Sequence, residues 1–169
     1  MRRPLLTLAA IAALALAAVP AFAANSVKVV PKFSGKLAGV KSKSDVPVRL
    51  PSRVSVDDDI KPSQVKGAVE SARDGRYHLS LGVGSGCHEA TACFVASFFA
   101  REGAVPKLKQ KVSLARDIEG RFRPIKCGAS CAAAEIQWRQ GRVLYDIQYK
   151  GTKRQLKALA NSAIKAGPR

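Results

Sequence analysis

The sequence predicts an α+β domain in which a mostly antiparallel sheet of about five or six strands is covered by an amphipathic C-terminal helix. Three observations support this fold class. Apolar and polar residues alternate in several runs after residue 76, as they do in half-buried strands. A glycine turn joins the runs Ala134–Arg139 and Arg142–Tyr149 into a β-hairpin. The segment Thr152–Ile164 then carries apolar residues at helical spacing.

The N-terminus has the organisation of a signal peptide. Met1–Ala23 begins with two arginines, continues with the apolar run Leu5–Val19, and ends in the small-residue pattern Ala21-Phe22-Ala23. Cleavage is expected after Ala23. The apolar run is short for a membrane span. The sequence therefore predicts a periplasmic or secreted protein with no transmembrane span.

The chain is strongly basic, with a formal net charge of +17. Removal of the signal peptide leaves 27 basic and 12 acidic residues, a net charge of +15. Such a charge predicts contact with an anionic partner and says nothing about the fold. We expect an anionic envelope polymer, lipid headgroups or an acidic envelope protein, and we do not expect nucleic acid in this role. The alternative is a solvated basic surface without a dedicated partner.

Residues 24–45 are interpreted as a basic flexible arm that precedes a single small α+β domain over residues 46–169. The segment Asn25–Lys43 contains no acidic residue and is rich in Gly and Ser as well as Lys. Its lysines are candidate anion-binding residues: Lys28, Lys32, Lys36, Lys41 and Lys43.

Two elements are predicted before residue 76. Val46–Leu50 is a candidate edge strand, because the prolines at 47 and 51 cannot donate to a central ladder. Ser63–Arg73 is a candidate short helix, with Ser63 as its cap and apolar residues on one face. The three aspartates 57–59 do not complete a calcium-binding loop, since Pro62 and Ala68 occupy the places of the required Gly and Glu. They are interpreted as a solvated acidic turn.

Four strands are predicted in the middle of the chain. Tyr77–Val83 alternates cleanly, and Cys93–Arg101 follows with Phe98 and Phe99 on opposite faces. The remaining two form a second hairpin around Glu119-Gly120, with strands at Lys111–Ile118 and Arg121–Ile125. If the C-terminal helix covers only one face of the sheet, the opposite face is where a groove would form.

The C-terminal hairpin and helix have the strongest signals. A two-residue turn at Gln140-Gly141 places Trp138 opposite Val143 and sets all apolar partners on one face. Thr152 and Gln155 have the spacing of a capping box at the start of the helix, and Gly167 is expected to end it. The apolar stripe of the helix comprises Leu156, Leu159, Ala160, Ala163 and Ile164.

The four cysteines predict two disulfides, because the chain is expected in an oxidising compartment. Three connectivities are open, and the local pairing Cys87–Cys93 with Cys127–Cys131 is favoured because each pair brackets a Gly- or Ala-rich turn. A four-thiolate zinc site is the alternative, but the spacings differ from those of zinc knuckles. We therefore predict no metal and no cofactor.

No catalytic motif is complete in this sequence. The glycine-rich run at 82–86 lacks both the spacing of a nucleophile elbow and the Gly-Lys-Ser/Thr of a phosphate loop. His88 and Glu89 form a candidate loop site, but a surface pair in the loop is the favoured interpretation, since adjacent residues rarely point into one site. We assign no catalytic residue.

Over roughly Leu50–Arg169 the chain resembles a group of small exported bacterial proteins of uncharacterised function. The resemblance rests on C-G-A-x-C at Cys127–Cys131, I-x-W at Ile136–Trp138, the Gly141 turn with Tyr145, and L-x-x-L-A-N-S-A-I at Leu156–Ile164. It implies export and carries no activity.

These observations favour an exported, non-enzymatic binding or accessory protein of the bacterial envelope that contacts an anionic component. Two alternatives stay open. One is a secreted protein-interaction or inhibitor domain that presents the disulfide-pinned loops near His88–Thr91 and Gly128–Ser130. The other is an envelope hydrolase that uses His88 and Glu89.

Overall fold

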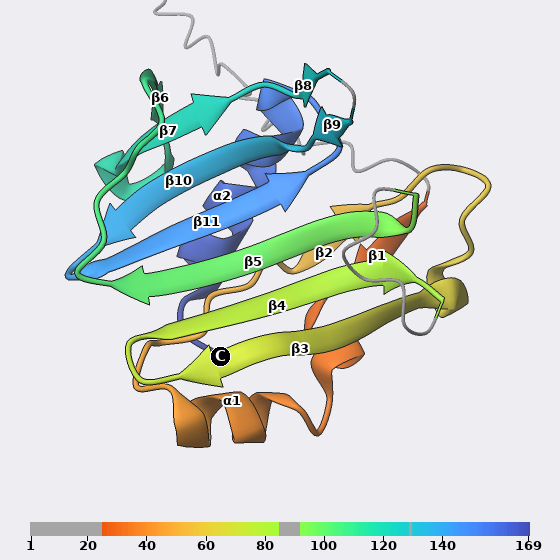
Figure 1. The fold of residues 1–169 in the computed structure, drawn as a ribbon, viewed down its shortest axis with the longest axis horizontal. Coiled ribbons are helices and arrows are strands. Elements are labelled where there is room, and N and C mark those ends of the chain that lie inside the picture. The colour runs from red at the N-terminus through yellow and green to blue at the C-terminus, as the bar shows by residue number, and fades with distance from the viewer. Residues whose placement is uncertain (1–24, 85–91, 129) are drawn as a thin grey trace, which may run out of the picture.

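The computed structural model describes residues 25–84, 92–128 and 130–169. Its centre is an antiparallel sheet with the strand order β3-β4-β5-β11-β10-β7-β6 (Figure 1). The strands are β3 (Val65–Arg73), β4 (Arg76–Val83), β5 (Phe94–Glu102), β6 (Gln110–Ser113), β7 (Glu119–Arg123), β10 (Ala134–Gln140) and β11 (Val143–Tyr149). The α+β prediction is confirmed, but this sheet has seven strands rather than five or six.

One face of the sheet carries the core. The helix α2 (Lys153–Ala166) packs on β10 and β11, and its five predicted apolar residues are all buried. The predicted capping box is present, since Gln155 N donates to Thr152 Oγ1 at 3.3 Å and Thr152 N donates to Gln155 Oε1 at 2.8 Å. The helix ends before Gly167, which has φ +75°.

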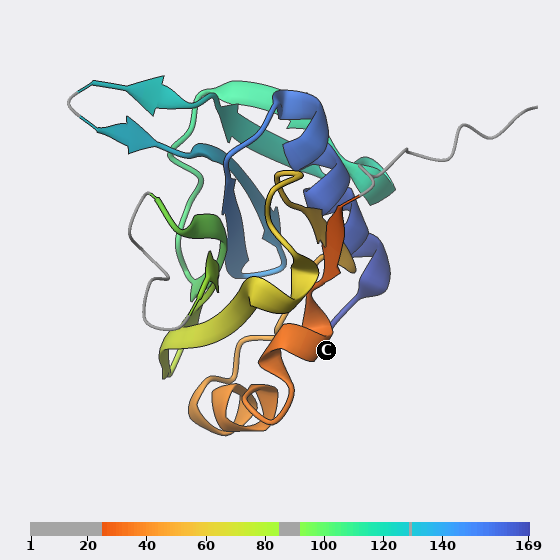
Figure 2. The same ribbon diagram turned by 90° about the vertical axis from the view of Figure 1, so that its right-hand side faces the viewer.

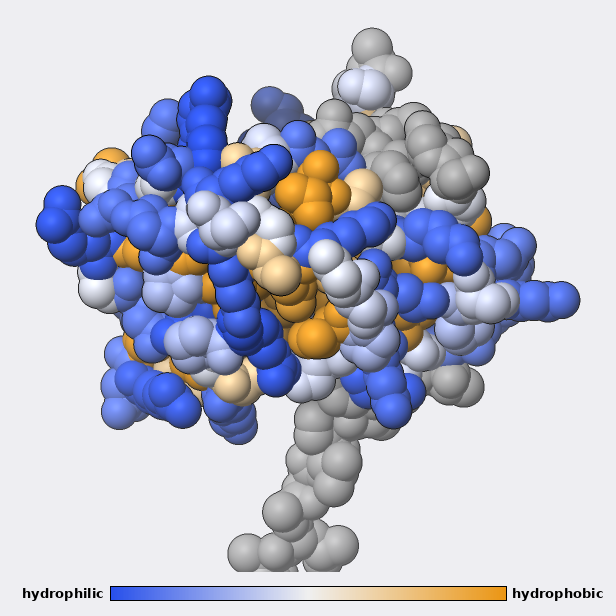
Figure 3. All heavy atoms as spheres, turned by 90° about the horizontal axis from the view of Figure 1, so that it is seen from below, coloured by the Kyte–Doolittle hydropathy of each residue, from blue (hydrophilic) through white to orange (hydrophobic). Residues whose placement is uncertain are grey.

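The rest of this face is covered by the N-terminal segment. It contains β1 (Ser26–Lys28), the 3-10 helix η1 (Val30–Phe33), α1 (Leu37–Lys43) and β2 (Arg53–Ser55). Residues 25–43 are thus folded onto the domain and do not form a flexible arm. The reason is an apolar set that the lysine-rich composition concealed, since the buried residues are Val27, Val29, Phe33 and Val40. On the face of the molecule formed by α1 and β3, the largest apolar area is central, and hydrophilic side chains surround it (Figure 3).

Val46–Leu50 is not a strand, although its apolar residues are buried. Tyrosine hydroxyls from the sheet satisfy its backbone groups and so replace a strand partner. Tyr145 donates to Pro47 O at 3.1 Å, and Arg49 N donates to the Tyr77 hydroxyl at 3.0 Å.

The predicted helix at Ser63–Arg73 is also wrong. A short 3-10 turn, η2 (Pro62–Gln64), leads directly into β3. The alternating Val65 and Gly67 face the core there, and Gly67 lies so close to η1 that an added Cβ would sit 2.5 Å from Lys32 O. Tertiary packing of the N-terminal segment therefore outweighs the local helical pattern.

Both predicted hairpins exist with different turns. In the C-terminal one, Gln140 pairs with Val143 and Trp138 with Tyr145, so the loop is Gly141-Arg142. Gly141 has φ +61° and is the first loop residue, the place at which a type II′ turn requires glycine. The register is displaced by two residues, so the predicted faces are preserved.

The other hairpin joins β6 to β7 through residues 114–118 rather than through Glu119-Gly120. Glu119 is instead the first residue of β7 and pairs with Ser113. Arg116 and Asp117 have φ +58° and +55°, and this local left-handed backbone reverses the chain before Glu119.

Candidate functional site

The sheet face opposite α2 carries the candidate site, which we call the open face. Side chains paired across neighbouring strands project to the same face. The pairing register defines three rows on the open face. The first row is His78, Phe99, Asp146, Gln137 and Arg121; the second is Ser80, Ser97, Gln148, Glu135 and Arg123; the third is Arg73, Arg76, Arg101 and Leu144.

Two segments border the open face. Residues 103–109 cross it between β5 and β6, and Lys107 N donates to Gln137 Oε1 at 3.0 Å. The hairpin of β8 (Lys126–Cys127) and β9 (Cys131–Ala132) projects on this side of the sheet, away from α2 (Figure 2). These two segments border the central part of the open face, where His78 and Phe99 are half-buried.

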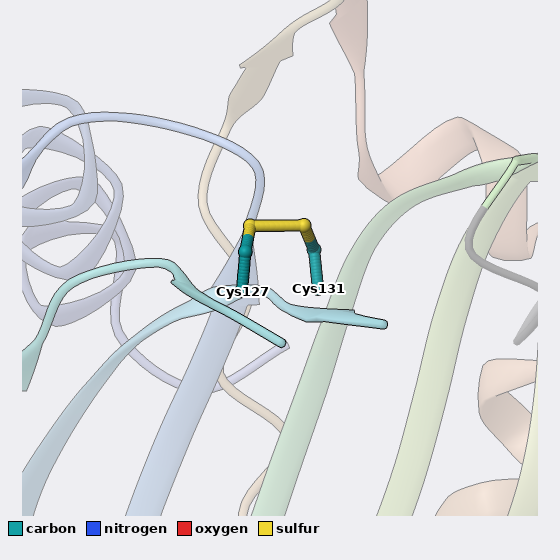
Figure 4. The surroundings of a disulfide bond; sticks show 2 residues. All are labelled: Cys127 and Cys131. Atoms are coloured by element: carbon teal, nitrogen blue, oxygen red, sulfur yellow. A yellow bond between two sulfur atoms is a disulfide. The ribbon is translucent and has the colours of Figure 1, made fainter. Parts of the chain in front are cut away.

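The predicted disulfide Cys127–Cys131 is present and closes the tip of the β8–β9 hairpin (Figure 4). All four strand residues of the hairpin are exposed, so the disulfide holds a projecting loop rather than a core. Cys93 is also disulfide-bonded. Its predicted partner Cys87 lies outside the described residues.

A buried polar network lies in the floor of the open face. Gln137 Nε2 donates to Glu135 Oε1 at 2.6 Å and to Asp146 Oδ2 at 2.9 Å. Arg123 forms an ion pair with Glu135 at 2.6 Å. Asp146 is 4 % exposed, and its Oδ1 has no hydrogen-bond partner among the described residues. Arg123 thus pairs with Glu135, while Asp146 is bound to the Gln137 amide.

The environment of Asp146 disfavours its charged form. Burial raises the pKa of this carboxyl well above its ordinary value of 3.8, and the adjacent Glu135 carboxyl raises it further. The Gln137 amide and the Arg101 charge act in the opposite direction. Asp146 therefore holds its proton to a higher pH than an ordinary aspartate does.

This environment predicts a dependence of stability on pH. Because the folded-state pKa of Asp146 is raised, its stabilising contribution is complete below the unfolded-state pKa and is lost as the pH rises through the folded-state value. We expect the free energy of unfolding to decline over that range. Asp146→Asn should remove this part of the decline and exceed the wild type in stability at neutral pH, measured by urea unfolding at several pH values.

Asp59→Asn is the matched control, because Asp59 is an exposed carboxylate on another part of the surface. It should leave the pH profile unchanged. A wild-type profile that rises with pH, or an Asp146→Asn profile parallel to it, would contradict the raised pKa.

An aromatic stack occupies the middle of the open face. His78 and Phe99 stack with ring centroids 4.0 Å apart and an interplanar angle of 17°. They line a cavity of about 730 Å³ that extends to the β8–β9 hairpin. Apolar walls come from Phe94 and Ile125, while Arg123 and Lys150 place positive charge at its margin. This combination of apolar surface and a few charged groups is typical of small-ligand sites.

A second cavity, of about 370 Å³, adjoins the first. It also contains His78, Phe99 and Gln148, so the two cavities are parts of one groove. We call it the open-face groove. Asp146 lies in its wall, together with the three arginines of the third row.

The arginine row consists of Arg73, Arg76 and Arg101, which lie directly opposite one another on three adjacent strands. Like charges in this arrangement repel one another. All three residues are exposed, and none forms an ion pair with a carboxylate among the described residues. The row therefore offers unneutralised donors at one end of the groove.

A larger but more open hollow of about 990 Å³ runs along the outer side of α2. Lys153, Arg154, Lys157 and Lys165 line it, with Ser52 on the facing segment. It lacks aromatic side chains and buried polar groups, so it is a basic helix surface rather than a shaped site. A charge removed from this surface is therefore a control for charges removed from the open face.

The predicted site residues are placed as follows. Lys32 Nζ donates to Pro62 O at 2.7 Å and Lys36 Nζ to Gly67 O at 2.5 Å, so both are used in packing the N-terminal segment. Lys28, Lys41 and Lys43 are exposed, and anion binding by them stays a prediction. His88 and Glu89 lie outside the described residues.

Sequence reasoning missed the polar network and the arginine row. The sequence did contain one indication of the network: polar residues alternate with apolar ones on both strands of the C-terminal hairpin, which predicts a polar face on that side of the sheet. Within the described ranges, no group of three or more His, Cys, Asp or Glu side chains is arranged to hold a metal. The helices of the same residues include none long and apolar enough to cross a membrane.

Comparison with models of known families, with curated proteins and with solved structures yields no match to this chain. The function is accordingly argued from the chain's own residues.

Proposed function

We propose that the protein is an exported, non-enzymatic binding protein that holds an anionic component of the cell envelope in the open-face groove. The observation that carries this proposal is the arginine row. Three adjacent cations without a carboxylate partner are stabilised when an anion binds between them, and Arg binds carboxylate and phosphate groups through paired hydrogen bonds. Export rests on the signal-peptide pattern of Met1–Ala23.

Binding without catalysis is supported by the state of the two acidic groups in the floor. Glu135 is held by Arg123 and Gln137, and Asp146 is bound to the same amide. Both carboxyl groups are already engaged in this network, which favours holding a ligand over transferring a proton. We assign them a structural and ligand-orienting role.

The proposal is tested by binding of mature protein to two anionic probes, phosphatidylglycerol vesicles and polygalacturonate, at low and high salt. Arg101→Ala should weaken binding to at least one probe about tenfold, because a charge-assisted hydrogen bond contributes about 1.5–3 kcal/mol. High salt should weaken binding by the wild type.

Lys157→Ala is the matched control, since it removes the same charge from the α2 surface. It should change the affinity less than about twofold. If both variants lose affinity equally, binding depends on the net charge of the protein and not on a specific site. No binding to either probe would reject the proposal.

A protein-interaction domain is the second candidate function. The β8–β9 hairpin favours it, because a disulfide fixes an exposed loop beside Ile125, which is 45 % exposed. Capture of one envelope protein by the wild type, lost on Ile125→Asp and insensitive to Arg101→Ala, would support this function instead.

A further inference from the structure

We infer that the anionic component is an acidic saccharide chain, with a sugar ring stacked in the middle of the open-face groove and its anionic groups bound at the two ends. This inference rests on the proposed function and adds the chemical class of the ligand. It is carried by the order of groups along the groove: the arginine row, then the aromatic and polar groups, and then the Arg123 guanidinium, which also pairs with Glu135.

The two ends of the groove are separated along the strands. Arg101 marks the first end, and Ser97 lies in the same row as Arg123 at the second end. Arg101 lies four positions after Ser97, which corresponds to roughly 13 Å along β5. A single small anion cannot reach both ends. A chain that carries anionic groups at intervals can do so.

The middle of the groove suits a ring with one apolar face. The stacked rings of His78 and Phe99 lie parallel and line both cavities. A sugar ring has an apolar C–H face, which packs on an aromatic ring, and hydroxyl groups around its edge. Phe99 is half-buried, so it is fixed in the sheet and still accessible from the groove.

Polar groups lie where those hydroxyls would point. Asp146 lines the smaller cavity, is nine-tenths or more buried, and has an Oδ1 without a hydrogen-bond partner among the described residues. Gln148 lies between the two cavities, and Ser97 lines the larger one. A protonated Asp146 offers one hydroxyl donor and one carbonyl acceptor, and a sugar hydroxyl can donate to that acceptor.

The same acidic groups argue against a polyanion with closely spaced charges. The carboxyl groups that face the groove are Asp146 and Glu135, and only Glu135 has an arginine partner. A continuous run of phosphates would offer no hydroxyl donor to the floor of the groove and would place negative charge beside the Glu135 carboxylate. A neutral saccharide would leave the arginine row without an anion. An acidic saccharide places hydroxyls beside Asp146 and carboxylates beside the arginines.

The test compares four probes by isothermal titration calorimetry with mature protein: an oligogalacturonide of defined length, a neutral galactose oligomer of equal length, linear polyphosphate and single-stranded DNA. We expect the oligogalacturonide to bind most tightly, at least tenfold tighter than the neutral oligomer. Phe99→Leu should weaken oligogalacturonide binding about tenfold and change polyphosphate binding less than twofold, because leucine keeps the apolar volume and loses the flat ring.

Val105→Ala is the control for apolar truncation, since Val105 is 59 % exposed and lies outside the groove. Both variants are first checked for an unchanged thermal transition, so that loss of binding reports on the site. Phe99→Leu with unaltered oligogalacturonide affinity would overturn the inference.

The outcomes separate this inference from the proposed function. Polyphosphate or DNA binding that depends on Arg101 and exceeds oligogalacturonide binding would reject the saccharide and leave the anion site standing. Failure of every anionic probe to respond to Arg101→Ala would reject both.

Discussion

Trp138→Ala is expected to lower the free energy of unfolding by about 3–5 kcal/mol, the largest effect of any substitution considered for this protein. Trp138 is 1 % exposed and stacks on Tyr145, with ring centroids 5.4 Å apart and an interplanar angle of 21°. It lies on β10 on the face covered by α2. Truncation removes the contact of the sheet with its helix and leaves a cavity that rigid neighbours cannot fill.

Urea unfolding followed by far-UV circular dichroism measures this effect, because the substitution removes the chain's single tryptophan fluorophore. Trp138→Phe is the control and should cost much less, since a phenyl ring still packs on Tyr145. The indole Nε1–H has no hydrogen-bond partner among the described residues, so no bond is lost in that variant. A loss below about 1 kcal/mol for Trp138→Ala would show that this core is loosely packed.

Gly67→Ala is expected to destabilise the protein by about 2–3 kcal/mol, although it adds a single methyl group to a strand. The new Cβ would lie 2.5 Å from Lys32 O and 2.9 Å from the Phe33 ring. Because the nearest atom is backbone, η1 must move away from β3, and the hydrogen bond from Lys36 Nζ to Gly67 O is disturbed. We expect a lower thermal unfolding temperature and faster limited proteolysis near residue 35.

Gly39→Ala is the matched control, because Gly39 lies in α1 with no atom near its Cβ position. It should stabilise the protein by about 0.5–1 kcal/mol, since alanine has the higher helix propensity. If both substitutions stabilise, the N-terminal segment is not packed against β3.

The two C-terminal elements could be predicted from the sequence because their signals are local. The stripe of α2 and its capping box depend on neighbours within four residues, and the structure confirms both. The register of the β10–β11 hairpin was missed because it depends on which loop position takes glycine. The sequence did not predict that the N-terminal segment covers the sheet, because its apolar residues follow neither helical nor strand spacing. They share one buried face only when they pack against the sheet.

The candidate site could be predicted only in part. The expectation that Phe98 and Phe99 face opposite sides holds, with Phe98 in the core and Phe99 in the groove. The arginine row could not be foreseen, because it joins residues of three strands whose pairing the sequence leaves open. The contact of Glu135 and Asp146 likewise depends on the register of two strands.

The first and last parts of this chain meet in the folded protein, and this has a consequence for how it folds. Ser52 N donates to Ser162 Oγ across 110 residues, and Arg169 N donates to Val48 O at 2.9 Å. Contacts of such long range cannot form until the final helix has been synthesised, and a fold that depends on them forms slowly. We expect nascent chains that lack α2 to remain unfolded. Until α2 has been synthesised, such a polypeptide stays unfolded and can still pass through a narrow channel.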